Sequence, residues 1–217
     1  MSRNYGQYCG LARALDVVGD RWNLLIVRQL LIAPARYRQL ADGLPGIATN
    51  LLAERLRDLE KHGVIERRLD ENGANVRYAL TAWGAQLREP IESLIRWSAP
   101  LMMPGPGGNH FRADWLVVAL PALLAAREPI EHTTTVGIAT EGGMVQILAT
   151  PSNTTVSSHD GRKLDAVITA DPPWILGLAA GALTLDNVRD VVHIDGDEAA
   201  IQRVFGGPIG RTSAATE

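Results

Sequence analysis

The stretch that decides the fold is residues 36–69, RYRQLADGLPGIATNLLAERLRDLEKHGVIERRL. A short helix fits residues 36–42. Residues 43–46 (GLPG) then force a turn, because glycine and proline disfavour a helix interior. A long helix follows over residues 47–62, with Gly63 just past its end, where glycine is preferred. The stretch therefore predicts two helices joined by a tight turn.

A β-hairpin is expected directly after the second of these helices. Residues 64–69 and 76–80 are rich in strand-forming side chains, and Asn72 and Gly73 between them suit the positive φ of a hairpin tip. The hairpin would form a small β-wing next to the helix-turn-helix.

Further helices are expected on both sides of this motif. Upstream, residues 11–18 have a helical apolar pattern, and a second helix should begin at Asp20, a good N-cap, and run to Pro34. Downstream, residues 82–97 are again helical in pattern, with a kink expected near Pro90.

The long helix over residues 47–62 has one apolar and one polar side. At 100° per residue, Leu56 and Leu59 fall within about 40° of Leu52, and the three form the side to be buried. The other side carries Thr49, Asn50, Glu54, Arg57 and Lys61. On an isolated helix this would be an ordinary solvated face. Here it follows a helix and a tight turn and precedes a hairpin, in the order that binding in a DNA groove requires.

Specific contacts can be assigned to this face. Asparagine suits adenine and arginine suits guanine in the major groove, so we expect Thr49, Asn50 and Arg57 to contact bases. The role of Glu54 is open, because it could face cytosine or pair with a nearby arginine. The phosphate contacts are expected from the surrounding cations Arg36, Arg38, Arg55, Lys61, Arg67, Arg68 and Arg77.

Composition divides the 217 residues into two parts. The chain is 46% hydrophobic and 21% charged, as in an ordinary globular protein. Residues 1–98 have 14 basic and 11 acidic residues, and residues 99–217 have 7 and 13, so only the first part has a net positive charge that favours a polyanion. We predict a DNA-binding and dimerisation domain over residues 1–103, a linker at 104–109, a second domain over 110–207 and a flexible tail at 208–217.

The second domain is expected to make the fold α+β as a whole. A helix fits residues 114–127, and strand-like runs at 133–139, 145–149, 154–158 and 166–169 suggest an antiparallel sheet. Three segments should follow: an apolar helix through residues 174–183, a short segment at 191–194 and a last helix at 197–205.

Motifs spread over residues 5–98 resemble the HxlR family of bacterial winged-helix regulators. They are CGLARALDVVGDRW from Cys9, RLRDLEKHGVI from Arg55 and YALTAWG from Tyr78. The resemblance implies a homodimer on two-fold-related operator DNA, with the helices that flank the reading motif forming the dimer interface. The apolar residues of the second helix fit such an interface. Ala48 and Thr49 stand where the family often has serine and proline, a departure that bears on base preference and not on the fold. We expect repression, by covering a promoter.

Residues 164–181 and 192–205 resemble the sterol-carrier type of fold, which implies a pocket for an apolar ligand. Trp115, Trp174 and Leu178 are the candidates for its wall, although aromatic side chains on apolar helices also form ordinary core. The alternative function from this resemblance is an apolar-ligand carrier whose N-terminal half is an interaction module.

Cys9, the single cysteine, has two interpretations. In several relatives a cysteine at this position senses thiol-reactive compounds, and Arg13, one turn away, could favour its thiolate. The other interpretation is a small side chain packed at the start of the first helix.

Other function classes find little support in the sequence. The histidines lack metal-binding spacing and there is no phosphate-binding glycine loop, so we expect no enzyme activity, no metal and no cofactor. No apolar run reaches the roughly 20 residues of a membrane span, and no signal peptide is recognised, so we expect a cytoplasmic protein.

Overall fold

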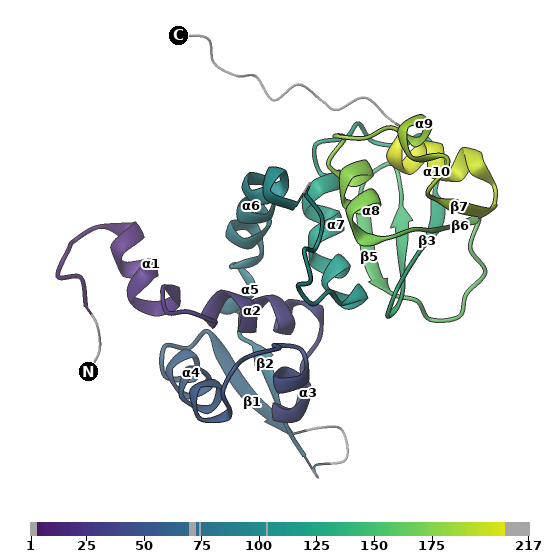
Figure 1. Ribbon diagram of the computed structural model, residues 1–217. Helices are drawn as coiled ribbons and strands as arrows, with labels where there is room; N and C mark the ends of the chain where they lie inside the picture. Colours follow the sequence, from purple (N-terminus) through teal and green to yellow (C-terminus); the bar gives the residue numbers. More distant parts are fainter. Residues whose placement is uncertain (1–3, 70–72, 74, 103, 207–217) are drawn as a thin grey trace, which may run out of the picture. The chain divides into compact units, whose positions relative to one another are not determined.

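The computed structural model describes residues 4–69, 73, 75–102 and 104–206 (Figure 1). The chain folds as two compact units, Met1–Ile91 and Glu92–Glu217. The division falls inside a helix. Residues 104–109, expected as a linker, contain no helix or strand. Residues 208–217, expected as a flexible tail, and Asn72, expected at the hairpin tip, lie outside the described residues.

The first unit contains the expected helix-turn-helix and hairpin. Its elements are α1 (Gly10–Val18), α2 (Asn23–Ile32), α3 (Tyr37–Asp42), α4 (Thr49–Lys61), β1 (Ile65–Leu69), β2 (Val76–Leu80), α5 (Ala82–Ala85) and the start of α6 (Arg88–Ser98). The two strands pair antiparallel from Ile65 opposite Leu80 to Leu69 opposite Val76. Gly46, in the turn before α4, and Gly63, just past the end of α4, have φ of +88° and +71°, the left-handed conformation that glycine adopts without strain.

Two expectations for the flanking helices are wrong. Helix α2 begins at Asn23, and its N-cap is Trp22 in a left-handed conformation (φ 85°), because Asp20 is used in an ion pair with Arg55 and does not cap the helix. Residues 82–97 form two helices, α5 and α6, separated at Gln86 and Leu87. Pro90 falls in the first turn of α6, where a missing N–H breaks no helical hydrogen bond, so it causes no kink.

The core of the first unit joins three helices and the base of the wing. Its fully buried large side chains are Ile26 and Val27 from α2, Leu40 from α3, Leu44 from the turn, Leu52, Leu56 and Leu59 from α4, and Ile65 from β1. Burying a side chain of this size stabilises a fold by about 1.5–3 kcal/mol. This core holds α4 with its polar side outward.

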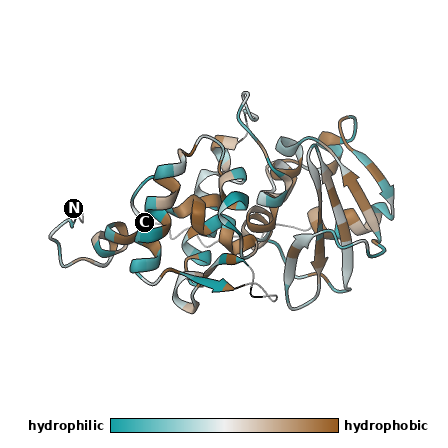
Figure 2. Ribbon diagram, turned by 90° about the horizontal axis from the view of Figure 1, so that it is seen from below, coloured by the Kyte–Doolittle hydropathy of each residue, from teal (hydrophilic) through white to brown (hydrophobic). Residues whose placement is uncertain are grey.

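The second unit is a five-stranded sheet with helices, and it completes the α+β fold. The elements after α6 are η1 (Ala99–Met102), η2 (Ala113–Trp115), α7 (Leu116–Leu124), β3 (Thr134–Thr140), β4 (Gly143–Ala149), β5 (Thr154–Ser158), β6 (Ala166–Thr169), α8 (Pro172–Ala179), α9 (Leu185–Val188), β7 (His193–Gly196) and α10 (Glu198–Phe205). The strand order is β5-β4-β3-β6-β7. Hydrophobic segments occur in both the strands and the helices (Figure 2).

The sheet is mixed, which corrects the expectation of an antiparallel sheet. Strands β3 and β6 are parallel, with Val136 opposite Ala166 and Ile138 opposite Ile168, while the other three pairs are antiparallel. Alternating side chains predict that a strand exists but do not determine its direction. After β5 the chain crosses through residues 159–165 to the other side of β3, where β6 pairs with it.

Buried apolar side chains line one face of this sheet. Val136, Ile138, Val145, Ile147 and Ile168 are buried at alternate positions of β3, β4 and β6. Among the described residues, no helix has the length and apolar character that a bilayer crossing requires.

Candidate nucleic-acid interface

Helix α4 is held at both ends by contacts outside the helix. The Tyr37 hydroxyl of α3 donates a hydrogen bond to the backbone carbonyl of Thr49 at 2.6 Å, and at the other end the Val64 N–H donates to the carbonyl of Leu59 at 2.9 Å. Leu52, Leu56 and Leu59 are at most 1% exposed. The orientation of α4 about its own axis is therefore determined by packing.

The polar side of α4 is exposed. The exposed residues on it are Thr49, Asn50, Glu54, Arg57 and Lys61. Arg57, Lys61 and, on α3, Arg38 make no ion pair with any described residue. Glu54, whose role the sequence left open, pairs with Arg55 at 3.4 Å between Oε1 and Nη2. Glu54 thus has a cationic neighbour on α4.

Arg55 differs from the other candidate phosphate contacts. Its side chain is only 14% exposed, and its guanidinium contacts Asp20 at 2.5 Å and Asp58 at 3.3 Å. These contacts tie α4 to the turn between α1 and α2. Arg55 therefore has a structural role in this chain, and sequence reasoning missed it because Asp20 lies 35 positions away.

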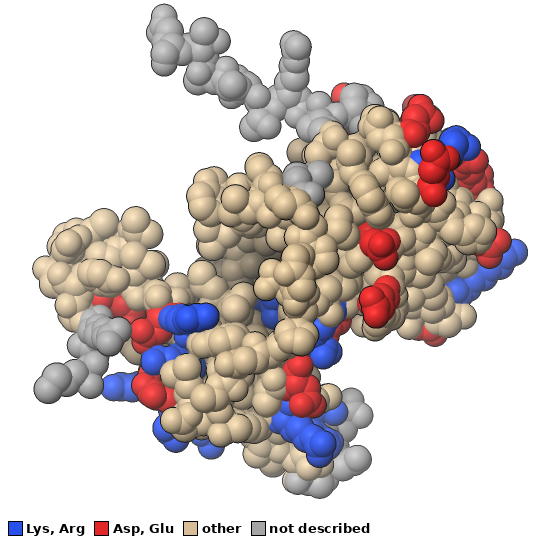
Figure 3. Space-filling view, viewed as in Figure 1, with Lys and Arg blue, Asp and Glu red and all other residues tan. Residues whose placement is uncertain are grey.

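Two basic residues of the wing, Arg67 and Arg68, lie at the surface with acidic partners. Arg67 pairs with Glu60 at 2.9 Å and lies over the Tyr78 ring at 5.9 Å, and Arg68 pairs with Glu66. Arg77 is half-buried and Arg36 is exposed. Figure 3 shows basic side chains over the first unit, interspersed with acidic ones. Exposed ion pairs contribute little to stability, so phosphates can compete for these arginines.

Cys9 is the N-cap residue of α1 and is exposed. The backbone N–H groups of Ala12 and Leu11 at the start of this helix lower the pKa of the Cys9 thiol below its ordinary value. Arg13, which the sequence suggested as the cause, pairs with Asp16 at 3.6 Å instead. The thiol is accessible and is not packed in a core.

The candidate pocket residues of the second unit are packed differently from one another. Leu178 is fully buried, whereas Trp115 and Trp174 are partly exposed, and Trp115 makes an edge contact with Phe111 at 6.5 Å between ring centroids. None of the three lines a pocket of about 280 Å³ in this unit, whose lining includes Arg127, Leu183, Leu185, Gln202 and Phe205.

No group of three or more His, Cys, Asp or Glu side chains suited to a metal ion occurs among the described residues. The arrangement that does stand out is an exposed polar helix face, preceded by a helix and a glycine-containing turn and followed by a two-stranded wing. These features define a DNA-binding winged helix-turn-helix protein of the transcription-regulator class.

Comparison with known proteins identifies the family. Residues 17–105 match the family described as HxlR-like helix-turn-helix. The transcriptional regulator YodB of Bacillus subtilis (strain 168) is 34% identical over 93 residues, which are 42% of this chain and 83% of YodB. The uncharacterized regulator YvaP of the same organism is 32% identical over 93 residues, 42% of this chain and 86% of YvaP. The chain belongs to the HxlR-like helix-turn-helix family.

Two solved structures from B. subtilis cover a similar part of the chain. Quinone-bound YodB is 31% identical over 42% of this chain and 96% of that one, with a TM-score of 0.37. Reduced YodB is 32% identical over 46% of this chain and 99% of that one, with a TM-score of 0.39.

Proposed function

We propose that this protein is a homodimeric transcriptional regulator that binds a two-fold-related operator and represses by covering a promoter. The observation that carries the proposal is the polar side of α4, which is exposed over its whole length while the opposite side is buried. A recognition helix inserts this kind of face into the major groove.

The contacts in the proposed complex follow from exposure and pairing. Thr49 and Asn50 lie in the first turn of α4, the part that usually reaches base edges, and Arg57 lies two turns further along on the same side. The proposed phosphate contacts are Arg36, Arg38, Lys61, Arg67, Arg68 and Arg77. Arg55 is left out of this set, because Asp20 and Asp58 hold its guanidinium.

Exposed apolar side chains near α1 support the proposed dimer. Tyr8 is fully exposed, Tyr5 and Leu11 are 59% and 69% exposed, and Leu15 and Leu25 are about 40% exposed. A soluble monomer rarely leaves this many large apolar side chains together at its surface. In a two-fold dimer the same patch on each copy covers the other.

The second unit is proposed to be a sterol-carrier-like domain that binds an apolar effector. Helices α7 and α8 are apolar on nearly all sides, and Val118, Leu120, Ile175 and Leu178 are buried between them and their neighbours. An effector that binds one arrangement of the dimer better than another would change the separation of the two reading heads. Trp115 and Trp174 remain the proposed wall residues together with Leu178.

Cys9 is proposed as a thiol sensor in addition. It is exposed at a helix N-terminus, where backbone N–H groups favour a thiolate.

Because the proposed target is the bacterial chromosome, the proposal includes a cytoplasmic location.

A salt titration of DNA binding tests the main proposal. The full chain is titrated against fluorescently labelled DNA from upstream of its own gene, with shuffled DNA of equal length as control, and sedimentation reports the oligomeric state. We expect sub-micromolar binding by a dimer that weakens steeply as salt rises. Equal and weak affinity for both DNAs at low salt would contradict the proposal and favour the ligand-carrier alternative.

A further inference from the structure

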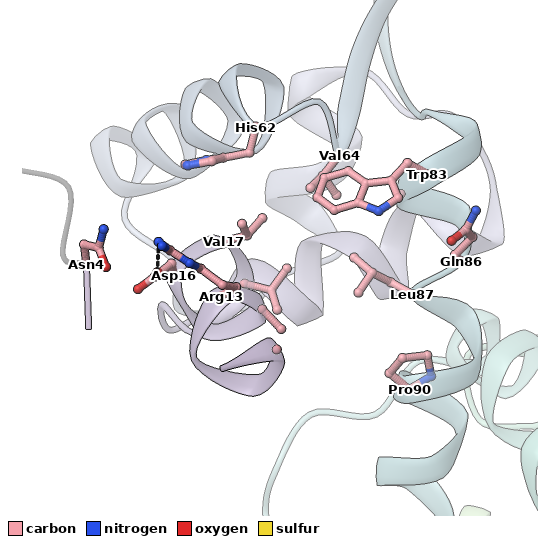
Figure 4. Close-up of a pocket in the computed structure, with 14 residues that line it drawn as sticks. Asn4, Arg13, Asp16, Val17, His62, Val64, Trp83, Gln86, Leu87 and Pro90 are labelled. Carbon is pink, nitrogen blue, oxygen red and sulfur yellow. Dashed lines mark ion pairs between the residues drawn. The ribbon is translucent and has the colours of Figure 1, made fainter. Parts of the chain in front are cut away.

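The first unit contains a cavity of about 690 Å³, which we call the α1 cavity (Figure 4). It lies between α1 on one side and the end of α4, the start of β1 and the segment from α5 to the start of α6 on the other. Its apolar lining is Val17, Val18, Val64, Trp83, Leu87 and Pro90. Its volume is in the range of about 300–1,000 Å³ that is typical of small-molecule sites.

The ionisable groups that line this cavity, Arg13, Asp16 and His62, already have partners. Arg13 pairs with Asp16 at 3.6 Å, and Asp16 also accepts a hydrogen bond from the Tyr5 N–H at 3.0 Å. A ring nitrogen of His62 lies 2.8 Å from the backbone carbonyl of Asp58. An ionised ligand would therefore lose its hydration without finding an uncompensated charge, so the site favours an uncharged molecule.

Trp83 determines the shape of ligand that fits. Trp83 lines the cavity and is 53% exposed, and it lies in the short helix α5, of which Gly84 is the buried residue. An indole that faces an open cavity offers a flat apolar surface for offset or edge stacking of another ring. From α1, Gly10 and Ala14 also line the cavity, beside Arg13 and Asp16, and their small side chains leave room for a ring system.

The wall that carries Trp83 is joined to the junction between α4 and the wing. The Thr81 hydroxyl donates to the Gly63 carbonyl at 2.6 Å. Gly84 packs so closely that an added Cβ would lie 1.9 Å from the Val64 carbonyl oxygen. A displacement of Trp83 is therefore transmitted to the residues that connect the proposed reading helix to β1.

We propose that the α1 cavity binds an uncharged, predominantly apolar aromatic molecule, which stacks on Trp83 and thereby alters how α4 is presented to DNA. The binding site stands on the cavity alone, whereas its effect on DNA reading rests on the proposed function. This site is in the first unit and is separate from the effector site proposed for the second.

Nile red, an uncharged aromatic dye that fluoresces strongly in apolar surroundings, serves as the probe. Two variants fill the cavity: Gly10→Leu, where an added Cβ meets no atom within 4 Å, and Ala14→Phe from the same side of α1. Ala125→Leu, at an exposed position of the second unit, is the matched control. The full chain is used throughout, and circular dichroism confirms that each variant is folded.

We expect saturable dye binding that both filling variants weaken by about tenfold or more, because their side chains occupy the ligand volume, while Ala125→Leu binds like the parent. In addition, saturating dye should change the affinity of the parent for its DNA and leave that of the filled variants unchanged.

Three results would overturn the proposal. The first is the absence of saturable binding. The second is binding that the filling variants leave intact, which would place the dye elsewhere, including the second unit. The third is conversion of both variants to monomers in sedimentation, which would show that a second copy of the chain occupies the cavity. If the dye result holds but no DNA is bound, the cavity assignment stands and the proposed function fails.

Discussion

The variant Arg57→Ala tests whether Arg57 contacts a DNA base or only solvent. The Arg57 side chain is exposed and has no ion pair among the described residues, so its removal should change the free energy of unfolding by less than about 0.5 kcal/mol. Removal of a base-reading side chain costs about 1–3 kcal/mol per half-site. A two-fold site contains the interaction twice, so the expected decrease in binding free energy is about 2–6 kcal/mol, or at least roughly thirtyfold in affinity.

The assay is fluorescence anisotropy on the upstream DNA and on shuffled DNA at one salt concentration. Arg162→Ala is the matched control, because Arg162 is 80% exposed, lies in the second unit and pairs with nearby Asp160 at 2.8 Å. Lys61→Ala, which removes a proposed phosphate-binding cation, should weaken binding to both DNAs equally. In a salt titration it should reduce the slope by about one for each phosphate that is no longer neutralised.

The reasoning about Arg57 is refuted by either of two results. One is an affinity of Arg57→Ala within about twofold of the parent, which corresponds to only about 0.4 kcal/mol and places the side chain in solvent. The other is an equal decrease in affinity for upstream and shuffled DNA, which makes Arg57 a phosphate-binding residue.

Three further predictions concern the thiol and the two units. Backbone N–H groups lower the pKa of the Cys9 thiol, so the pH at which its alkylation rate is half-maximal should be lower than the corresponding pH for N-acetylcysteine. Cys9→Ser should abolish the oxidant-induced release of the protein from DNA, and an unchanged release would exclude Cys9 as a thiol sensor. Gly84→Ala should lower the free energy of unfolding by about 1–3 kcal/mol in urea titrations, since its Cβ would overlap the Val64 carbonyl; wild-type stability would show that the surrounding backbone relaxes freely. The Thr135 N–H and hydroxyl lower the pKa of Asp165, so its ionised form stabilises the second unit at neutral pH, and this contribution is lost as the pH falls through the lowered pKa. Asp165→Asn should therefore lower the free energy of unfolding at pH 7 by a small amount, because solvent screens this exposed carboxylate, and the difference from the parent should shrink below about pH 4; a difference that is constant with pH contradicts this role.

Local sequence signals predicted the elements of the first unit well. Gly46 was predicted in the turn before α4 and Gly63 just past its end, and both have the positive φ that favours glycine there. The spacing of Leu52, Leu56 and Leu59 predicted the buried side of α4. The start of α2 was predicted wrongly, because Asp20 is a good N-cap by type but is bound to Arg55. A preference that acts within a few residues was overridden by an ion pair between distant ones.

In the candidate interface, too, some features follow from the local sequence and others only from contacts between distant residues. The exposure of Asn50 and Arg57 follows from helical periodicity, which is a local property. The burial of Arg55 does not, because it depends on the position of α4 relative to the turn before α2. Likewise, nothing in the order of residues indicates that β6 runs parallel to β3 or that Trp83 faces Val17 across a cavity.

Periodicity, turn residues and the HxlR motifs were thus sufficient to predict a winged helix-turn-helix and the side of α4 that faces solvent. Both follow from neighbours in the chain, because local residues determine where helices and turns form and which side of a helix is apolar. Three features were decided only when the chain folded: which arginines are held by carboxylates, the direction of β6, and the α1 cavity. Each depends on distances between residues that are far apart in the sequence, and only the packing of the folded chain determines those distances.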